Sequence, residues 1–415
     1  MRIKHPNGVL YILVYILIYP LLKLLFRLRV DRSDFEKKKG PFLVLSNHAS
    51  FLDFLLVMLT IYPRRLNTVT AQKFFFYRPL NKLLPLMGCI PKNLFDPDVR
   101  SIMRIMAVLK HGGGVLLYPE GRCSTDGAYA RIHKSTGKLV KKLGVPVVSC
   151  HVEGAFLCMP FWRKRFRTGR IRVTIADLFS GDDLKTLPIE DINDAIDARL
   201  SGDDRPAPQK ELQTNRAKNL TEGLSNILYL CPKCKAELTM ETTGNAIKCT
   251  ACGNTGIMDR AGRLRPAPDS IIPGTISAWH REQAGYEIQR LSEDMEPIEE
   301  LVSVRIPSDK PGAGMSPGGK GKLRLDPKGW NYDGTLSGDE VSLFFPIETV
   351  PAIPFDDDDN FQIYSGGSFY MFTPEDSRKC AKYSLLGECA HQRFASQVQM
   401  TPGGKNGLFA TTESS

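Results

Sequence analysis

The stretch PFLVLSNHASFLD, residues 41–53, changes its hydrophobic period in the middle. The apolar run 42–45 is typical of a short buried strand of a parallel sheet. After it, apolar side chains fall at helical spacing, and Ser50 is the expected N-cap of that helix. His48 therefore lies at a strand-to-helix turn, at the carboxyl end of a strand, where open α/β sheets bind ligands.

The same alternation continues on the C-terminal side of this turn. Apolar runs predict further strands over 67–71, 115–118, 145–151 and 171–176, and helical patterns fall between them at 98–110 and 133–143. Strands that alternate with helices predict an α/β domain with a mostly parallel sheet and helices on both faces. We expect this domain to occupy residues 36–200.

Composition limits the class of protein without choosing a function. The chain has 415 residues, 42% of them apolar, and a net charge of +10 that is concentrated before about residue 175. A basic surface suits nucleic acid, an anionic membrane or phosphorylated substrates. The ten cysteines include two Cys-x-x-Cys pairs and six scattered residues, which is no disulfide framework and indicates a reducing compartment.

An apolar segment opens the chain. Residues 8–22 are uninterrupted by charge, and as a helix they would span about 22 Å, short of the ~30 Å hydrocarbon core of a bilayer. Three interpretations remain: a re-entrant or interfacial segment, a single spanning helix that includes Lys23, and a buried core helix. We expect residues 1–35 to associate with a membrane, and the basic flank favours a cytoplasmic position for the domain that follows.

Two local patterns offer chemistry. Asp53 follows His48 by five residues, and an Asp that holds an imidazole in one tautomer lets the other ring nitrogen accept a proton from a hydroxyl. The ordinary alternative is that His48 caps the helix and Asp53 is a solvated first-turn acid. The segment YPEGRCS, residues 118–124, also follows an expected strand, and the planar guanidinium of Arg122 suits a phosphate.

Four motifs in order form a more specific pattern. Asn-His-x-x-x-x-Asp at 47–53 is followed by Gly-x-Ile-x-Lys at 88–92, Pro-Glu-Gly-Arg-x-Ser at 119–124, and Val-Pro-Val-Val at 145–148 with a later glycine. Over roughly residues 5–180 this set closely resembles the glycerolipid acyltransferase family, which includes the lysophosphatidate acyltransferases.

The resemblance implies roles for individual residues. His48 would be the general base that deprotonates the acceptor hydroxyl, and Asp53 would orient it. The glycerol phosphate would be held by four residues: Lys92, where the family commonly has Arg, with Glu120, Gly121 and Arg122. No residue looks like an acyl-enzyme nucleophile, and Cys123 would be the only candidate.

The resemblance also implies the partners of the protein. The acyl donor would be acyl-CoA or acyl-ACP, and the acceptor a lysophospholipid, with lysophosphatidate first. The thioester supplies the driving force, so catalysis would need no cofactor, and no nucleic acid is expected. The protein would work at the cytoplasmic face of the cell membrane. The alternatives are an acceptor such as a lyso-aminolipid, or a non-catalytic lipid-binding scaffold that retains the fold.

A cysteine pattern predicts a metal site in a second domain. Fourteen residues separate the two Cys-x-x-Cys pairs, a spacing that resembles a zinc ribbon, here over residues 227–265. The expected ligands of this structural zinc are Cys231, Cys234, Cys249 and Cys252. A rubredoxin-like iron site or a redox pair are the alternatives. A spacer or docking role is expected for the ribbon.

The remaining chain is assigned by pattern alone. Residues 201–226 are expected to be a linker and helix, with the helix over 215–230. Residues 266–396 are expected to form a helix over 269–295, strands over 302–374 that include a hairpin of 321–325 and 329–334, and a closing helix over 380–394. Strands closed by a helix resemble a pleckstrin-homology-like barrel. Its Gly-rich loop with Lys310, Lys320 and Lys322 is either a headgroup contact or an ordinary solvated loop. Residues 356–359 are expected to be an acidic turn, and 397–415 a disordered tail.

Overall fold

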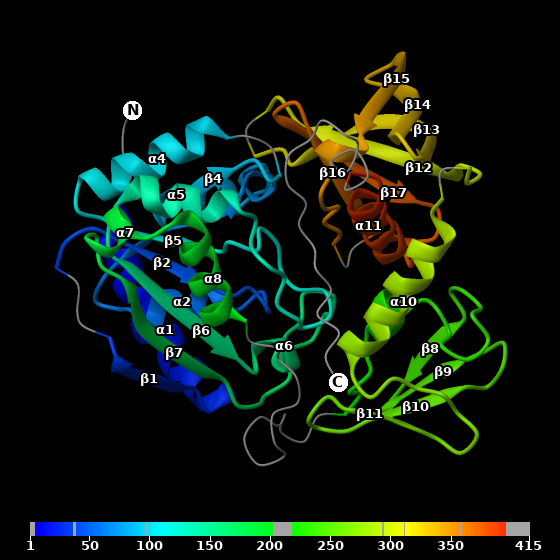
Figure 1. The fold of residues 1–415 in the computed structure, drawn as a ribbon, viewed down its shortest axis with the longest axis horizontal. Coiled ribbons are helices and arrows are strands. Elements are labelled where there is room, and N and C mark those ends of the chain that lie inside the picture. Colours follow the sequence, from blue (N-terminus) through cyan, green and yellow to red (C-terminus); the bar gives the residue numbers. More distant parts are fainter. Residues whose placement is uncertain are drawn as a thin grey trace. The chain divides into compact units, whose positions relative to one another are not determined.

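The computed structural model describes residues 5–35, 39–95, 98–201, 218–292, 294–310, 312–356 and 359–395 (Figure 1). The chain divides into two compact units. The first comprises residues 1–280 with 308–315, and the second comprises 281–307 with 316–415.

A seven-stranded sheet forms the centre of the first unit. Its strand order is β1-β7-β6-β2-β5-β3-β4, and each neighbouring pair is parallel except β6 with β7. The mostly parallel sheet expected from the sequence is thus confirmed. The strands are β1 (Arg29–Asp34), β2 (Phe42–Ser46), β3 (Leu66–Ala71), β4 (Ile90–Lys92), β5 (Gly114–Leu117), β6 (Val147–Glu153) and β7 (Arg172–Phe179).

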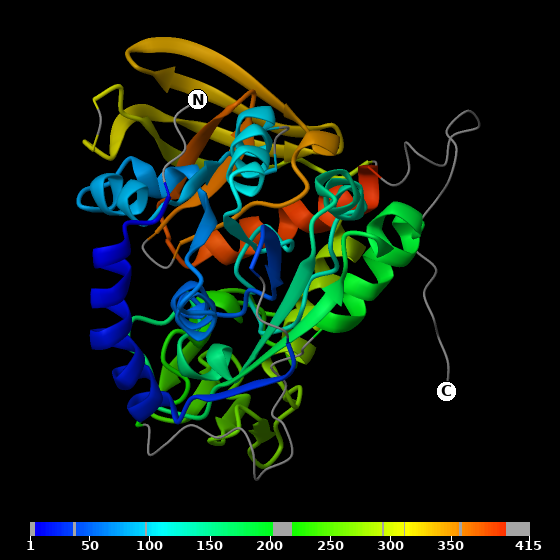
Figure 2. The same ribbon diagram turned by 90° about the vertical axis from the view of Figure 1, so that its left-hand side faces the viewer.

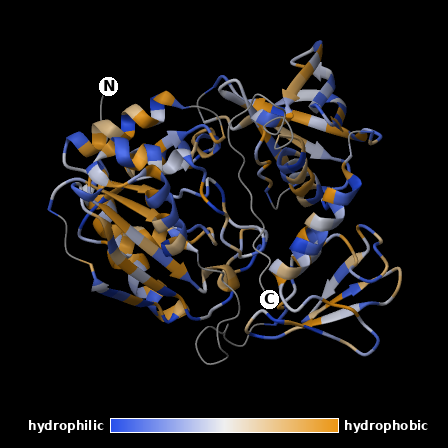
Figure 3. Ribbon diagram, in the orientation of Figure 1, coloured by the Kyte–Doolittle hydropathy of each residue, from blue (hydrophilic) through white to orange (hydrophobic). Residues whose placement is uncertain are grey.

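Helices cover both faces of this sheet, and the central strand β2 is therefore buried on both sides. Phe42 and Val44 pack with side chains of α1 and α2, whereas Leu43 and Leu45 pack with side chains of α4, α5 and α8. The central strands β2 and β5 are predominantly hydrophobic (Figure 3). The helices of the domain are α1 (Gly8–Phe26), α2 (Asp53–Thr60), α3 (Leu80–Leu86), α4 (Val99–Lys110), α5 (Ser135–Leu143), α6 (Ala155–Cys158), α7 (Asp183–Thr186) and α8 (Ile189–Leu200), with a 3-10 turn at Gln72–Phe75.

The sheet order brings the sequence motifs to one edge. Strands β6, β2, β5, β3 and β4 are neighbours and run in the same direction. Their carboxyl ends therefore meet at the same edge, which carries the turn 47–53, the loop 118–124, Lys92 and the end of β6. This edge is where an open α/β sheet binds its ligands.

Helix α1 is apolar on its exposed side. Of the described residues, only this helix is long and apolar enough to cross a membrane, by length and composition alone. Tyr11, Leu22 and Phe26 are buried, whereas most of its other large aliphatic side chains lie exposed, among them Val9, Leu17 and Leu24. The helix runs along the outside of the unit (blue in Figure 2).

Two local predictions are wrong. Ser50 is not the N-cap, because α2 begins at Asp53 after Leu52, and the Ser50 hydroxyl instead donates to the Met159 carbonyl oxygen. The helix expected over 215–230 is reduced to α9 (Leu224–Ile227) among residues 218–230, while 215–217 lie outside the described residues. A glycine with φ of 83° at position 223 breaks any longer helix.

The cysteine-rich segment forms a small sheet of its own within the first unit. Its antiparallel strands, in the order β11-β10-β9-β8, are β8 (Met240–Thr243), β9 (Ala246–Cys249), β10 (Thr255–Met258) and β11 (Leu264–Pro266). We call residues 218–280 the four-cysteine module. Helix α10 (Ile276–Arg290) starts in this module.

The second unit is a six-stranded antiparallel sheet closed by a helix. The strand order is β15-β14-β13-β12-β17-β16, and the predicted hairpin pairs Gly321 with Gly334. The elements are β12 (Ile298–Pro307), β13 (Met315–Asp326), β14 (Gly329–Leu336), β15 (Asp339–Pro346), a 3-10 turn at Ile347–Thr349, β16 (Phe361–Ser365), β17 (Ser368–Pro374), α11 (Lys379–Ala390) and a π-turn at His391–Ala395. The expected tail, residues 397–415, and residues 357 and 358 of the acidic turn lie outside the described residues.

Candidate active site

The turn after β2 is held to β6 by a side chain. The Asn47 amide donates from Nδ2 to the Val152 carbonyl oxygen (2.9 Å) and accepts at Oδ1 from the Val152 backbone N–H (2.8 Å). Both residues are buried. The chain therefore leaves the sheet at a fixed point, directly before His48.

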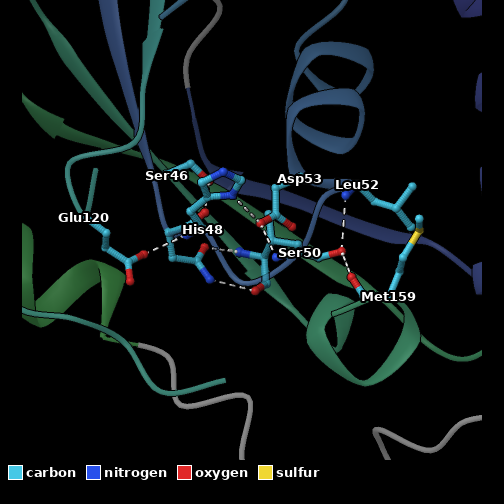
Figure 4. Close-up of polar contacts among 9 residues, drawn as sticks. Ser46, His48, Ser50, Leu52, Asp53, Glu120 and Met159 are labelled. Carbon is cyan, nitrogen blue, oxygen red and sulfur yellow. Dashed lines mark hydrogen bonds and ion pairs between the residues drawn. The ribbon is translucent and has the colours of Figure 1, made fainter. Parts of the chain in front are cut away.

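His48 and Asp53 lie in direct contact (Figure 4). The His48 Nδ1 atom is 3.1 Å from Asp53 Oδ2, and the same carboxylate oxygen accepts from the Ser50 backbone N–H at 2.7 Å. Asp53 is fully buried while the His48 side chain is 24% exposed. The Tyr118 ring stacks on the imidazole, with centroids 4.3 Å apart. The aspartate thus holds one ring nitrogen while the ring stays accessible.

The loop after β5 fixes the backbone of His48 on both sides. The His48 N–H donates to Glu120 Oε1 (2.7 Å), and the His48 carbonyl oxygen accepts from the Ser124 N–H (2.8 Å). The second Glu120 oxygen accepts from the Ala130 N–H at 3.0 Å. Gly121 has a φ of 76°, a conformation that suits glycine, so the loop can turn between Glu120 and Ser124.

The protonation of these groups follows from their burial and their neighbours. Burial raises the pKa of Asp53, and His48 offsets only part of that effect. Burial lowers the pKa of His48, but Cys123 and Asp53 outweigh it and hold that pKa well above its ordinary value. Burial also raises the pKa of Glu120 to about 7, against the hydrogen bonds from Ala130 and His48. These neighbours thus favour the protonated imidazole, and the neutral ring that can accept a proton forms as the pH rises through the raised pKa.

Other expected binding residues lie around this site. Gly121 and Arg122 belong to the loop after β5, and the Phe95 ring reaches to 3.6 Å of a Cβ built on Gly121. Lys92 ends β4 at the same edge of the sheet. The assignment of Lys92, Glu120, Gly121 and Arg122 to phosphate binding stays a prediction. The contacts of Glu120 give it a structural role as well, because its two oxygens accept hydrogen bonds from the backbone N–H groups of His48 and Ala130.

Sequence reasoning missed three parts of this arrangement. It did not find the Asn47 contact with Val152, the use of Glu120 as a backbone acceptor, or the contact of Ser50 with Met159. Each joins residues far apart in the chain. The Asn-His pair and the position of Glu120 after a strand were the available signals, but neither names its distant partner.

The four expected metal ligands are brought together. The sulfur atoms of Cys231, Cys234, Cys249 and Cys252 lie within 4.8 Å of one another. Two of the separations are 3.7 Å, between Cys231 and Cys252, and 3.8 Å, between Cys234 and Cys249. A tetrahedron with metal–sulfur bonds of about 2.3 Å has edges of about 3.8 Å. The cluster thus has the dimensions of a tetrahedral thiolate site.

Comparison with known proteins agrees with the geometry. Residues 27–153 match the family described as Acyltransferase. A chloroplastic 1-acyl-sn-glycerol-3-phosphate acyltransferase of Brassica napus is 30% identical over 122 residues, which are 29% of this chain and 35% of that protein. A chloroplastic enzyme of the same name from Arabidopsis thaliana is 28% identical over 177 residues, 42% of this chain and 48% of that protein.

The match is confined to part of each protein. The chain spans about a third to a half of the length of these two relatives. The solved structure of a 1-acyl-sn-glycerophosphate acyltransferase from Thermotoga maritima is 18% identical, with a TM-score of 0.36, and covers 46% of this chain and 85% of that one. The family match, over residues 27–153, covers the part of the chain that carries His48 and Asp53.

Proposed function

Because residues 27–153 form a domain of the acyltransferase family, we propose that this protein is a membrane-associated O-acyltransferase. It transfers a fatty acyl chain from acyl-CoA or acyl-ACP to the free hydroxyl of a lysophospholipid. Lysophosphatidate is the first candidate acceptor, since the relatives are named as 1-acyl-sn-glycerol-3-phosphate acyltransferases.

The observation that carries the proposal is the contact between His48 Nδ1 and buried Asp53. With Nδ1 bonded to the carboxylate, Nε2 of the neutral ring is left to accept the proton of the acceptor hydroxyl. The hydroxyl oxygen then attacks the thioester carbonyl carbon, and an ester bond forms as the carbon–sulfur bond breaks. The proton on His48 passes to the departing thiolate, so the imidazole returns neutral.

Neighbouring groups support this role. The Glu120 carboxylate and the Ser124 N–H fix the backbone of His48, which keeps the imidazole facing one reaction position. The proposed phosphate-binding residues at the same edge of the sheet are Gly121, Arg122 and Lys92. Burial raises the pKa of the Cys123 thiol, which disfavours the thiolate that an acyl-enzyme intermediate on that residue would need.

An apolar acceptor requires access to the bilayer. Helix α1 exposes aliphatic side chains along most of its length, and basic residues follow it at Arg27 and Arg29. We propose that α1 associates with the membrane and that the basic flank keeps the catalytic domain at the cytoplasmic face.

We further propose that the four-cysteine cluster holds a structural zinc ion. The sulfur separations fit tetrahedral zinc, and hydrogen-bond donors from Thr239 and Asn254 approach the sulfurs of Cys249 and Cys231. Bound zinc would lock the two Cys-x-x-Cys turns together. The identity of the metal is tested by elemental analysis of the purified full chain, where one bound zinc per chain is expected.

The activity is tested with membranes that contain wild type, His48→Ala or the control His111→Ala, which changes an exposed histidine at the end of α4. Each is given lysophosphatidate, other lysophospholipids and a lyso-aminolipid with acyl-CoA or acyl-ACP. Acyl transfer by wild type and His111→Ala, but not by His48→Ala, is expected. Equal transfer by His48→Ala would refute the mechanism. No transfer by wild type to any acceptor would favour a non-catalytic lipid-binding scaffold.

A further inference from the structure

The loop that holds His48 is itself held from the four-cysteine module. Asp126, in the loop after β5, has Oδ2 3.7 Å from Nδ1 of His280, the fifth residue of α10. Both side chains are largely shielded from solvent, with exposures of 13% and 16%. Asp126 Oδ1 accepts a hydrogen bond from the Ala128 N–H (3.0 Å) and lies 3.3 Å from the Ser124 hydroxyl, which donates to the Ala128 carbonyl oxygen at 2.7 Å.

These contacts lead directly to His48. Ser124 lies beside Asp126 and is joined to it through Ala128, because its hydroxyl donates to the Ala128 carbonyl oxygen and the Ala128 N–H donates to Asp126. The backbone N–H of Ser124 donates to the His48 carbonyl oxygen. Two residues beyond Ala128, the Ala130 N–H donates to Glu120, whose other oxygen accepts from the His48 N–H. A displacement of Asp126 would therefore shift the hydrogen-bond partners of both the His48 N–H and the His48 carbonyl oxygen.

His280 is tied to the cysteine cluster on its other side. The indole N–H of its neighbour Trp279 donates to the Leu230 carbonyl oxygen at 2.9 Å, and Leu230 directly precedes Cys231. Asn254, two residues after Cys252, exchanges two hydrogen bonds with the Ile271 backbone, at 2.7 and 2.9 Å. The first half of the cluster is thus bonded to the start of α10 through Trp279, and the second half to the segment that leads into α10 through Ile271.

A second set of contacts anchors the module on the same part of the domain. The buried guanidinium of Arg163 pairs with Glu222 at 2.8 Å and donates to the Asn219 carbonyl oxygen at 2.9 Å. The adjacent Trp162 donates its indole N–H to the Thr125 carbonyl oxygen at 2.8 Å, one residue before Asp126. The module therefore meets the 124–126 segment directly through His280 and indirectly through Trp162.

We propose that the four-cysteine module is a brace for the acyltransferase site, in which His280 acts through Asp126 as a positioning residue for His48. Metal in the cluster fixes the start of α10, α10 presents His280 to Asp126, and Asp126 holds the loop that orients the catalytic base. The catalytic part of this inference rests on the function proposed above. The structural part, that metal and His280 stabilise the loop 120–130, does not.

The structural part is tested by hydrogen–deuterium exchange of the full chain. In His280→Ala the amides of Ser124 and Ala130 should exchange about tenfold faster than in wild type, because the loop opens more often. His280→Gln, which keeps a polar group facing Asp126, should restore most of the protection. Arg281→Ala, an exposed neighbour on α10, is the matched control and should exchange as wild type does.

Metal removal separates the brace from a general loss of stability. Chelation should speed exchange in the 120–130 loop of wild type but add little in His280→Ala, because the link is already broken. Unchanged exchange in His280→Ala, or an equal effect of chelation on both proteins, would overturn the proposal.

Kinetics test the catalytic part. His280→Ala should lower kcat about tenfold with little change in KM, since a misplaced base slows the chemical step without weakening binding. Faster loop exchange with unchanged kcat would overturn the positioning role. Faster exchange in a chain whose wild type transfers no acyl group would support the brace while refuting the proposed activity.

Discussion

Replacing Asp53 with asparagine tests the proposed base most directly. The asparagine side chain would have nearly the shape of the aspartate and could still accept from the Ser50 N–H, but it carries no charge. When His48 takes the hydroxyl proton, the buried carboxylate at 3.1 Å stabilises the imidazolium that forms. Asp53→Asn removes that stabilisation while it leaves the fold around the turn intact.

The expected loss follows from the contact distance. For unit charges at the observed 3.1 Å, Coulomb's law with an effective dielectric constant of about 20 gives about 5 kcal/mol. A neutral hydrogen bond from the ring N–H to the amide oxygen retains about 1.5 kcal/mol of this. The remaining ~3.5 kcal/mol corresponds to a decrease in kcat of roughly 300-fold.

The assay compares acyl transfer to lysophosphatidate by wild type and Asp53→Asn, with thermal unfolding as the control for folding. Burial raises the pKa of Asp53 in the folded state, so its stabilising contribution is present at low pH and is lost as pH rises through that raised value. Above that raised value the ionised carboxylate costs stability, so Asp53→Asn should not lower the melting temperature below that of wild type. A kcat within about threefold of wild type would refute the role given to Asp53.

Three further predictions concern the same network and the four-cysteine cluster. Glu120→Gln replaces one of two backbone acceptors with a donor, so kcat should fall roughly thirtyfold for a loss of about 2 kcal/mol; a rise in lysolipid KM alone would instead indicate a phosphate contact. Since Cys123 and Asp53 outweigh burial and raise the pKa of His48, kcat/KM should increase as pH rises through that raised pKa; a flat profile across the whole pH range in which the protein stays folded would contradict this. Cys249→Ser should abolish stoichiometric zinc binding and lower the melting temperature, as measured by elemental analysis and calorimetry.

The sequence was most informative where local pattern and function coincide. The change of period at residues 46–53 predicted a strand, a turn and a helix, and α2 does follow β2 through this turn. Parallel strands also place the ends of β2, β4 and β5 at one edge, so the motifs could be expected to meet. The hairpin of β13 and β14 was predicted by its alternation and turn glycines.

The sequence was least informative about contacts between loops. Whether Glu120 faces a substrate or the His48 backbone depends on β5 lying beside β2, and strand order is not encoded in the local pattern. Ser50 was expected to cap a helix, but its hydroxyl instead bonds to Met159, which is 109 residues away. The contact of His280 with Asp126 joins two segments whose own sequences suggest only a loop and a helix.

The amide side chain of Asn47 acts as a surrogate peptide group. The backbone ladder between β2 and β6 ends at Ser46 and Cys150, and beyond it Asn47 supplies the donor and the acceptor that Val152 would otherwise receive from another strand residue. The main chain is thereby released from the sheet one residue before His48 without leaving a buried peptide unpaired. Aspartate offers no donor at this position and would face the Val152 carbonyl oxygen, and serine is too short for both bonds. The position of His48 thus requires a residue 47 that can both donate to and accept from the Val152 backbone, and only a carboxamide of this length does both.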